Sequence, residues 1–68
     1  MGTIETELEM VERHVREGEV RVLRQREIVR ELFDHHHPTA LAEQLLVAFE
    51  KTLLDHRAHL ARLVLPAR

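Results

Sequence analysis

The chain contains no cysteine and no serine, and its only aromatic residues are two phenylalanines. Without cysteine it can form neither a disulfide nor a thiolate zinc site, which are common supports for chains this short. It also has no glycine-rich phosphate loop, no nucleophile elbow and no His-Glu-x-x-His run. We therefore expect no enzyme activity and no cofactor.

Long apolar runs and an excess of charge of one sign are missing as well. No stretch approaches the ~18 consecutive apolar residues of a bilayer-spanning helix, and no apolar run follows a basic N-terminal stretch as in a secretory signal. Ten lysine and arginine residues stand against twelve aspartate and glutamate residues, for a formal net charge of −2. We therefore expect a soluble cytoplasmic protein that binds no membrane.

Nucleic-acid binding has little support in the sequence and is the weakest functional hypothesis. Part of the first half is locally basic, through Arg13, Arg16, Arg21, Arg24, Arg26 and Arg30. Glutamates interleave with these arginines, which is more typical of a charged helix surface than of a phosphate-binding patch. Phe33 and Phe49 alone supply no platform for base stacking. We expect no nucleic-acid partner.

Glycine and proline are scarce, and their positions divide the chain in two. Gly2 and Pro66 lie near the ends, Pro38 lies in the middle, and Gly18 is the one internal exception. Pro38 disfavours a helical conformation at the residue before it, so a first helix must end there or earlier. Helix-forming residues fill the rest, and no segment alternates as a strand does. The pattern predicts an all-α fold, an antiparallel two-helix hairpin with coiled-coil-like packing.

We expect a single helical-hairpin domain over residues 1–68. Its predicted elements are a helix at about 3–34, a turn at about 35–38 and a helix at about 39–65. Thr3 and Thr39 are the expected N-caps. The three consecutive histidines fall in the turn, where adjacent side chains point in different directions. We therefore interpret them as turn residues rather than as a metal site.

The first helix carries an apolar stripe whose steps alternate between four and three residues, as in a packed helix. This first-helix stripe comprises Ile4, Leu8, Val11, Val15, Gly18, Val22, Gln25, Val29 and Leu32. Gly18 inside a helix costs about 0.5–1 kcal/mol relative to alanine, which indicates a close approach by another residue. Gln25 is expected to specify register rather than to add stability.

The second helix carries two apolar stripes. The main stripe, expected to face the first helix, comprises Leu41, Leu45, Phe49, Leu53, His56, Leu60 and Leu63. The second stripe lies on the opposite side and comprises Val47, Leu54, Ala58, Ala61 and Leu65. A single core in a chain this short supplies no more than ~3–5 kcal/mol, so self-association is a usual remedy. We expect the second stripe to be an interface, in a homodimer that forms a four-helix bundle or with a helical protein partner.

Three histidines form the candidate metal site, although a packing role is the preferred interpretation. Folding about residues 36–37 predicts that His14 lies level with His59, and Gly18 level with His56 or Asp55. Imidazoles of His14, His56 and His59 suit zinc, copper or nickel. However, the Glu-x-x-His pairing of di-iron bundles is absent. The preferred interpretation is that His56 is hydrogen-bonded and fills the space left by Gly18.

Three stretches of the chain resemble short uncharacterised bacterial proteins with two-helix hairpins. They are Glu12-Arg-His-Val-Arg-Glu-Gly18, Arg24-Gln-Arg-Glu-Ile28, and the Leu-Ala-Glu-x-Leu-Leu opening of the second helix at Leu41–Leu46. The resemblance covers most of the chain and implies a fold class but no activity. The favoured hypothesis is a self-associating helical interaction module, acting as a small regulator or adaptor. The alternative is a histidine-based metal-binding bundle.

Overall fold

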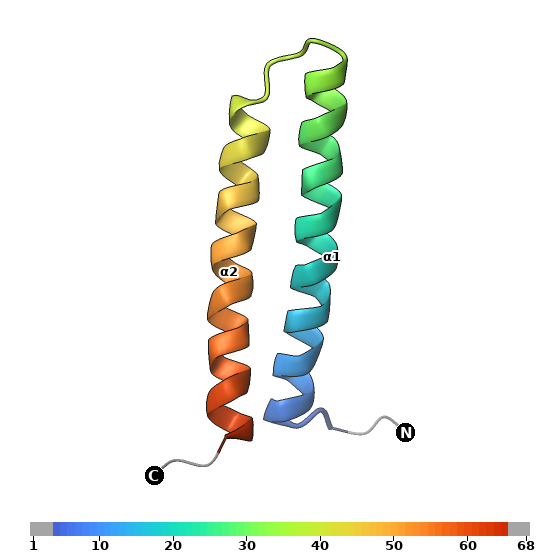
Figure 1. The fold of residues 1–68 in the computed structure, drawn as a ribbon. Coiled ribbons are helices and arrows are strands. Elements are labelled where there is room, and N and C mark those ends of the chain that lie inside the picture. The colour runs from blue at the N-terminus through green and yellow to red at the C-terminus, as the bar shows by residue number, and fades with distance from the viewer. Residues whose placement is uncertain (1–3, 66–68) are drawn as a thin grey trace.

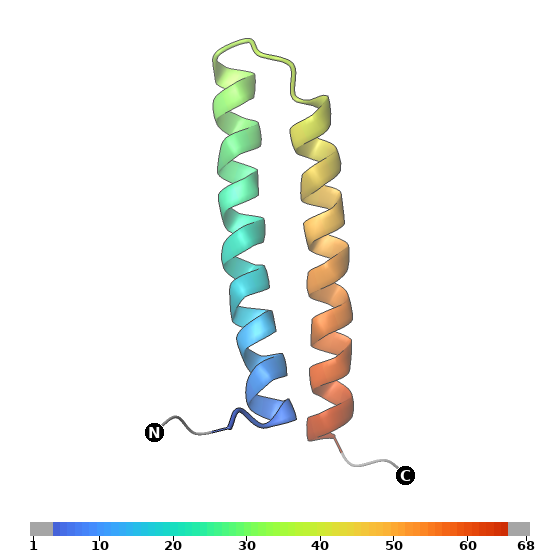
Figure 2. The same ribbon diagram turned by 180° about the vertical axis from the view of Figure 1, so that it is seen from behind.

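The computed structural model describes residues 4–65 and consists of two packed helices. α1 (Glu7–Asp34) and α2 (Ala40–Val64) run antiparallel and side by side, joined by a short connection at one end (Figures 1 and 2). The expected all-helical hairpin is confirmed, and no strand occurs within the described range. Neither described helix has an apolar stretch long enough to cross a membrane.

α1 begins at Glu7 because Thr6 and Glu9 form a capping box. The Glu9 amide donates to the Thr6 hydroxyl oxygen at 3.1 Å, and the Thr6 amide donates to Glu9 Oε1 at 3.0 Å. These two bonds satisfy donors that a helix N-terminus otherwise leaves without a partner. Thr3, the N-cap expected from the sequence, lies outside the described residues, and the helix starts later than the predicted residue 3.

α1 ends in a left-handed cap built from the three histidines. His36 has a φ of 59°, in the left-handed region. The His36 amide donates to the Phe33 carbonyl at 3.1 Å, and the His37 amide donates to the Leu32 carbonyl at 2.8 Å. This pair of bonds is the Schellman pattern, which usually places glycine at the left-handed position. Histidine tolerates that region better than most side chains, so the run reverses the chain without glycine.

The first-helix stripe packs against α2 as predicted, except at its N-terminal end. Its middle is buried or half-buried at Val11, Val15, Gly18, Val22, Gln25, Val29 and Leu32. Leu8 is 41% exposed, and Ile4 is 93% exposed because it precedes the helix. The 4–3 spacing therefore identified the face that α1 turns toward α2.

The sequence predicted only part of the α2 face that packs against α1 correctly. Leu41 is 82% exposed and Leu45 46% exposed, although both belong to the expected main stripe. The residues with the least exposure instead follow 4–3 steps through Ala42, Leu46, Phe49, Leu53, His56 and Leu60. The reason lies at Gln25, whose Nε2 donates to the Ala42 carbonyl at 2.9 Å. The small side chain of Ala42 leaves room for this buried amide.

The residues of α2 that lie opposite given residues of α1 differ from the predicted ones by about one helical turn. Gly18 lies against Leu53, and an ideal Cβ built on Gly18 would be 3.1 Å from Leu53 Cδ1. His14 lies beside His56, with ring centres 4.9 Å apart. The expectation that His14 lies level with His59, and that His56 fills the space left by Gly18, is therefore wrong. The side chain of Leu53 fills that space.

The core between the helices is thin. Val11, Val22 and Leu53 are its buried apolar side chains within the described range, together with the buried polar Gln25. The Cα radius of gyration is 15.8 Å, whereas a compact domain of this length has one of roughly 11 Å. An elongated single layer of two helices therefore leaves both of its broad faces in contact with solvent.

Candidate functional site

The second stripe of α2 lies on the surface of the hairpin. Val47, Leu54 and Leu65 are 65%, 63% and 66% exposed. Ala58 and Ala61 are exposed as well. Because α1 does not cover these side chains, the hairpin presents them to solvent along one flank of α2.

A groove between the helices adjoins the second stripe. Its apolar residues are Leu54 and the buried Leu53 of α2, with Leu23 and the buried Val22 of α1. Leu23 is 58% exposed and lines the groove from α1, opposite Leu54. Both helices therefore contribute apolar surface to this face of the hairpin.

Two ion pairs cross this groove and join the helices. Arg26 Nη2 lies 3.1 Å from Glu50 Oε2, and Arg57 Nη2 lies 3.4 Å from Glu19 Oε2. The four side chains are 41–56% exposed, so each pair contributes at most about 1 kcal/mol. Each helix supplies one acidic and one basic group, so the charges of the groove cancel. We refer to this surface, the groove with the second stripe, as the ion-pair face.

A second apolar groove lies on the other flank of α2. Leu41, Leu45 and Ala48 line it from α2, and Ile28 and Gln25 line it from α1. Leu41 is the most exposed leucine of the hairpin, at 82%. α2 therefore has apolar side chains on both sides of its contact with α1, although the sequence pattern assigned Leu41 and Leu45 to the interior.

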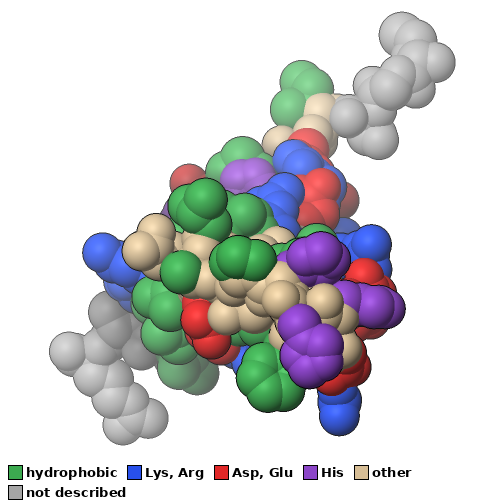
Figure 3. All heavy atoms as spheres, turned by 90° about the horizontal axis from the view of Figure 1, so that it is seen from above, with side chains coloured by type: hydrophobic (Ala, Val, Ile, Leu, Met, Phe, Trp, Pro, Cys, Tyr) green, Lys and Arg blue, Asp and Glu red, His purple; other side chains and the backbone are tan. Residues whose placement is uncertain are grey.

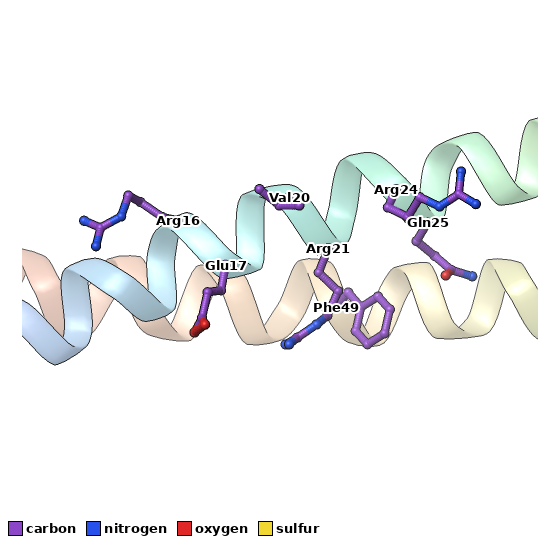
Figure 4. A pocket seen from close by; sticks show the side chains of 7 residues that line it. All are labelled: Arg16, Glu17, Val20, Arg21, Arg24, Gln25 and Phe49. Carbon is purple, nitrogen blue, oxygen red and sulfur yellow. The ribbon is translucent and has the colours of Figure 1, made fainter.

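Further along the same flank, a cationic side chain lies over an aromatic ring. The Arg21 guanidinium carbon is 5.6 Å from the centre of the half-buried Phe49 ring, within cation–π range. Figure 4 shows these two side chains together, while the guanidinium groups of Arg16 and Arg24 extend away on either side. Val20, Glu17 and Gln25 complete the lining of this pocket. It is an open surface pocket whose charged lining consists of three arginines and one glutamate.

The N-terminal end of α1 is organised around Arg13. Arg13 donates to Glu5 through two nitrogens, at 2.9 and 3.0 Å, and to Glu17 at 3.1 Å. The hydrogen bond from Arg13 lowers the pKa of Glu5, and the bond to Glu5 raises the pKa of Arg13. At the helix start, the bond from the Thr6 backbone amide lowers the pKa of Glu9. These groups are exposed and ionised, which suits a charged helix surface.

The three turn histidines are exposed at the end of the hairpin where the helices connect. Figure 3, which looks down on that end, shows histidine side chains gathered there. The ring of His35 folds back, so that its Nδ1 lies 2.9 Å from the Glu31 carbonyl oxygen. Together with the left-handed cap at His36, this contact supports the interpretation of the run as a turn.

The structure brings together two of the three candidate metal ligands. The rings of His14 and His56 are 4.9 Å apart and tilted by 48°. His59 points elsewhere, with its Nε2 3.6 Å from Glu7 Oε1. Within residues 4–65, no three His, Cys, Asp or Glu side chains are grouped so that they could hold one metal ion. The candidate set thus included this pair, but the sequence placed His14 level with His59 rather than with His56.

No family model, no curated protein and no solved structure matches this chain. The resemblance to short bacterial two-helix proteins therefore stays a prediction, and function must be argued from the surfaces described above.

Proposed function

We propose that the chain is a non-enzymatic helical interaction module that self-associates. A second copy packs on the ion-pair face and forms a four-helix bundle. The small assembly then acts as a regulator or adaptor through its remaining helix surfaces. The observation that supports this proposal most strongly is the exposed second stripe, which runs along a hairpin that buries three apolar side chains within residues 4–65.

The size of the face suits a second copy. Helices of 28 and 25 residues are roughly 40 Å long, and two helices packed side by side are about 20 Å wide. One broad face therefore has an area of roughly 800 Å², which is what each partner contributes to an interface of standard size.

The charges of the face also favour self-association. The ion-pair face carries Glu19 and Arg26 from α1, and Glu50 and Arg57 from α2. A two-fold axis makes each copy present the same patch to the other, so a patch with balanced charge avoids repulsion between like charges. A partner of strongly acidic or basic character would find no complementary excess of charge here.

The test compares two leucines on opposite flanks of α2 by sedimentation equilibrium in chelator, from micromolar to hundreds of micromolar. Leu54→Glu places a charge in the proposed interface, and Leu41→Glu places the same charge on the other flank, where exposure is 82%. Each buried carboxylate should cost at least about 2 kcal/mol, and a two-fold dimer buries two, so dimerisation should weaken roughly a thousandfold. Leu41→Glu should leave the dimer intact.

Each outcome has a defined meaning. A dimer that Leu54→Glu dissociates and Leu41→Glu does not supports the proposal. The reverse result would move the interface to the flank of Leu41 and refute the assignment of the second stripe. A folded monomer at hundreds of micromolar would refute self-association and favour a different helical protein as the partner.

A further inference from the structure

One pair of histidines joins the two helices at the edge of their contact. His14 of α1 and His56 of α2 are half-buried, and their ring centres are 4.9 Å apart. The close contact between Gly18 and Leu53 lies one turn away along each helix. The backbone positions of both histidines are therefore set by packing between the helices rather than by a loop.

The spacing of the rings fits shared coordination of a metal ion. A late first-row metal binds an imidazole nitrogen at roughly 2.0–2.1 Å, which places the ring centre about 3.2 Å from the ion. Two such rings on one ion have centres roughly 4.5 Å apart for a ligand angle near 90°, and roughly 5.2 Å apart for a tetrahedral angle. The observed 4.9 Å lies between these values.

We propose that His14 and His56 bind one late first-row transition-metal ion, such as Zn²⁺, Ni²⁺ or Cu²⁺, between α1 and α2. Both ligands come from one copy of the chain, so the site does not depend on self-association. Because no third His, Cys, Asp or Glu within residues 4–65 joins them, water fills the remaining coordination positions. The site is therefore exchangeable, and imidazole ligands favour Cu²⁺ over Zn²⁺ and exclude Mg²⁺ and Ca²⁺.

Several ionisable side chains near the pair already have partners. On α1, Arg13 binds Glu5 and Glu17. On α2, His59 pairs with Glu7 at 3.6 Å, so it is drawn away from His56. A bound ion therefore takes its protein ligands from two imidazoles, and it joins the helices in the half of the hairpin farther from the connection.

Metal binding is expected to stabilise the fold, because the unfolded chain does not hold His14 and His56 together. An ion that binds only the folded state raises the folded-to-unfolded ratio about a hundredfold when its free concentration is 100 times Kd. Chains of this size commonly use a metal to supplement a small core, and this chain has no cysteine to do so. The hairpin thus becomes more stable and more rigid when the metal is available.

The experiment is urea unfolding followed by circular dichroism, in chelator and with added Zn²⁺, Cu²⁺ or Mg²⁺. We expect Zn²⁺ and Cu²⁺ to shift the wild-type midpoint upward and Mg²⁺ to leave it unchanged. The variants His14→Gln and His56→Gln should each lose the shift, judged against their own midpoint in chelator. Two control variants should keep it: His59→Gln, and a triple variant with glutamine in place of His35, His36 and His37.

Loss of the shift in the triple turn variant alone would mean adventitious binding at the turn and would overturn the proposal. An unchanged wild-type midpoint in both Zn²⁺ and Cu²⁺ would overturn it too. Nuclear magnetic resonance provides a second measurement that needs no variant to fold. Substoichiometric Cu²⁺ should broaden the imidazole signals of His14 and His56 before those of the other histidines, and broadening that begins at the turn would contradict the site.

Discussion

The contact between Gly18 and Leu53 allows a quantitative test of how the helices are aligned. Replacing Gly18 with alanine adds a Cβ that would lie 3.1 Å from Leu53 Cδ1, and 3.6 and 3.8 Å from Leu53 Cβ and Cγ. The first distance is shorter than a normal van der Waals contact, while the other two are ordinary. Leu53 is 5% exposed, so its methyl group can retreat only by disturbing the packing around it.

Two opposing effects decide the result of Gly18→Ala. Alanine in place of glycine inside a helix adds about 0.5–1 kcal/mol of stability. Overpacking of a buried site removes about 1–3 kcal/mol, and one methyl group belongs at the low end of that range. We therefore expect the free energy of unfolding to change by less than about 0.5 kcal/mol. At an exposed position of α2, by contrast, Lys51→Ala should be more stable than Lys51→Gly by the full helix-propensity difference.

A double-mutant cycle isolates the contact. Leu53→Val removes Cδ1, so Gly18→Ala in that background should stabilise by about 1 kcal/mol, which gives a coupling energy of about the same size. The measurement is urea unfolding of the four proteins at one protein concentration. If Gly18→Ala stabilises the wild type as fully as it stabilises the Leu53→Val variant, the two residues are not in contact and the register of the hairpin described above is wrong.

Two further predictions concern the ends of α1. His36→Gly should stabilise the hairpin by about 0.5–1 kcal/mol in urea unfolding, because glycine adopts the left-handed φ of 59° without strain, whereas His37→Gly should give no gain. The hydrogen bond from the Thr6 amide lowers the pKa of Glu9 in the folded state below its ordinary 4.5. Above pH 4.5 the ionised Glu9 side chain therefore contributes stability to the folded state. This stability is lost as pH falls through the lowered pKa, so the urea midpoint should drop at acid pH, and Glu9→Gln, which keeps the capping box, should show a smaller drop.

The fold was predictable from the sequence because α1 repeats its pattern over many turns. A 4–3 spacing sustained through the first-helix stripe leaves only one face of the helix for packing. The face of α2 was harder to predict, because leucines occupy two adjacent rows. Leu41 is more hydrophobic than Ala42, so hydrophobicity favours the row of Leu41 and Leu45 over the row of Ala42 and Leu46. The hydrogen bond from Gln25 to the Ala42 carbonyl instead selects the second row. A pattern of apolar residues does not encode that bond.

Which residue of α2 lies opposite which residue of α1 could not be predicted, because this alignment depends on the geometry of the connection. A symmetric fold about residues 36–37 ignores the left-handed residue that follows α1 and the conformation of the residues that lead to Ala40. Glycine at position 36 would have signalled a Schellman cap, whereas histidine is an infrequent occupant of that position. The resulting displacement of about one turn brings His14 to His56, so the candidate site depended on a detail that residue spacing does not reveal.

The residues that fix the alignment of the helices also help to explain why the core between them is thin. Gly18, Gln25 and His56 occupy positions on the contact between the helices where leucine or valine would contribute more apolar burial. Each fixes a specific contact, with Leu53, the Ala42 carbonyl and His14 respectively, and so favours one register over its neighbours. A polar residue at such a position gains specificity at a loss of stability. Three apolar side chains are buried within residues 4–65, so that loss falls on a thin core. The proposed second copy on the ion-pair face would add burial outside the hairpin, and the proposed metal ion between His14 and His56 would join the two helices within it.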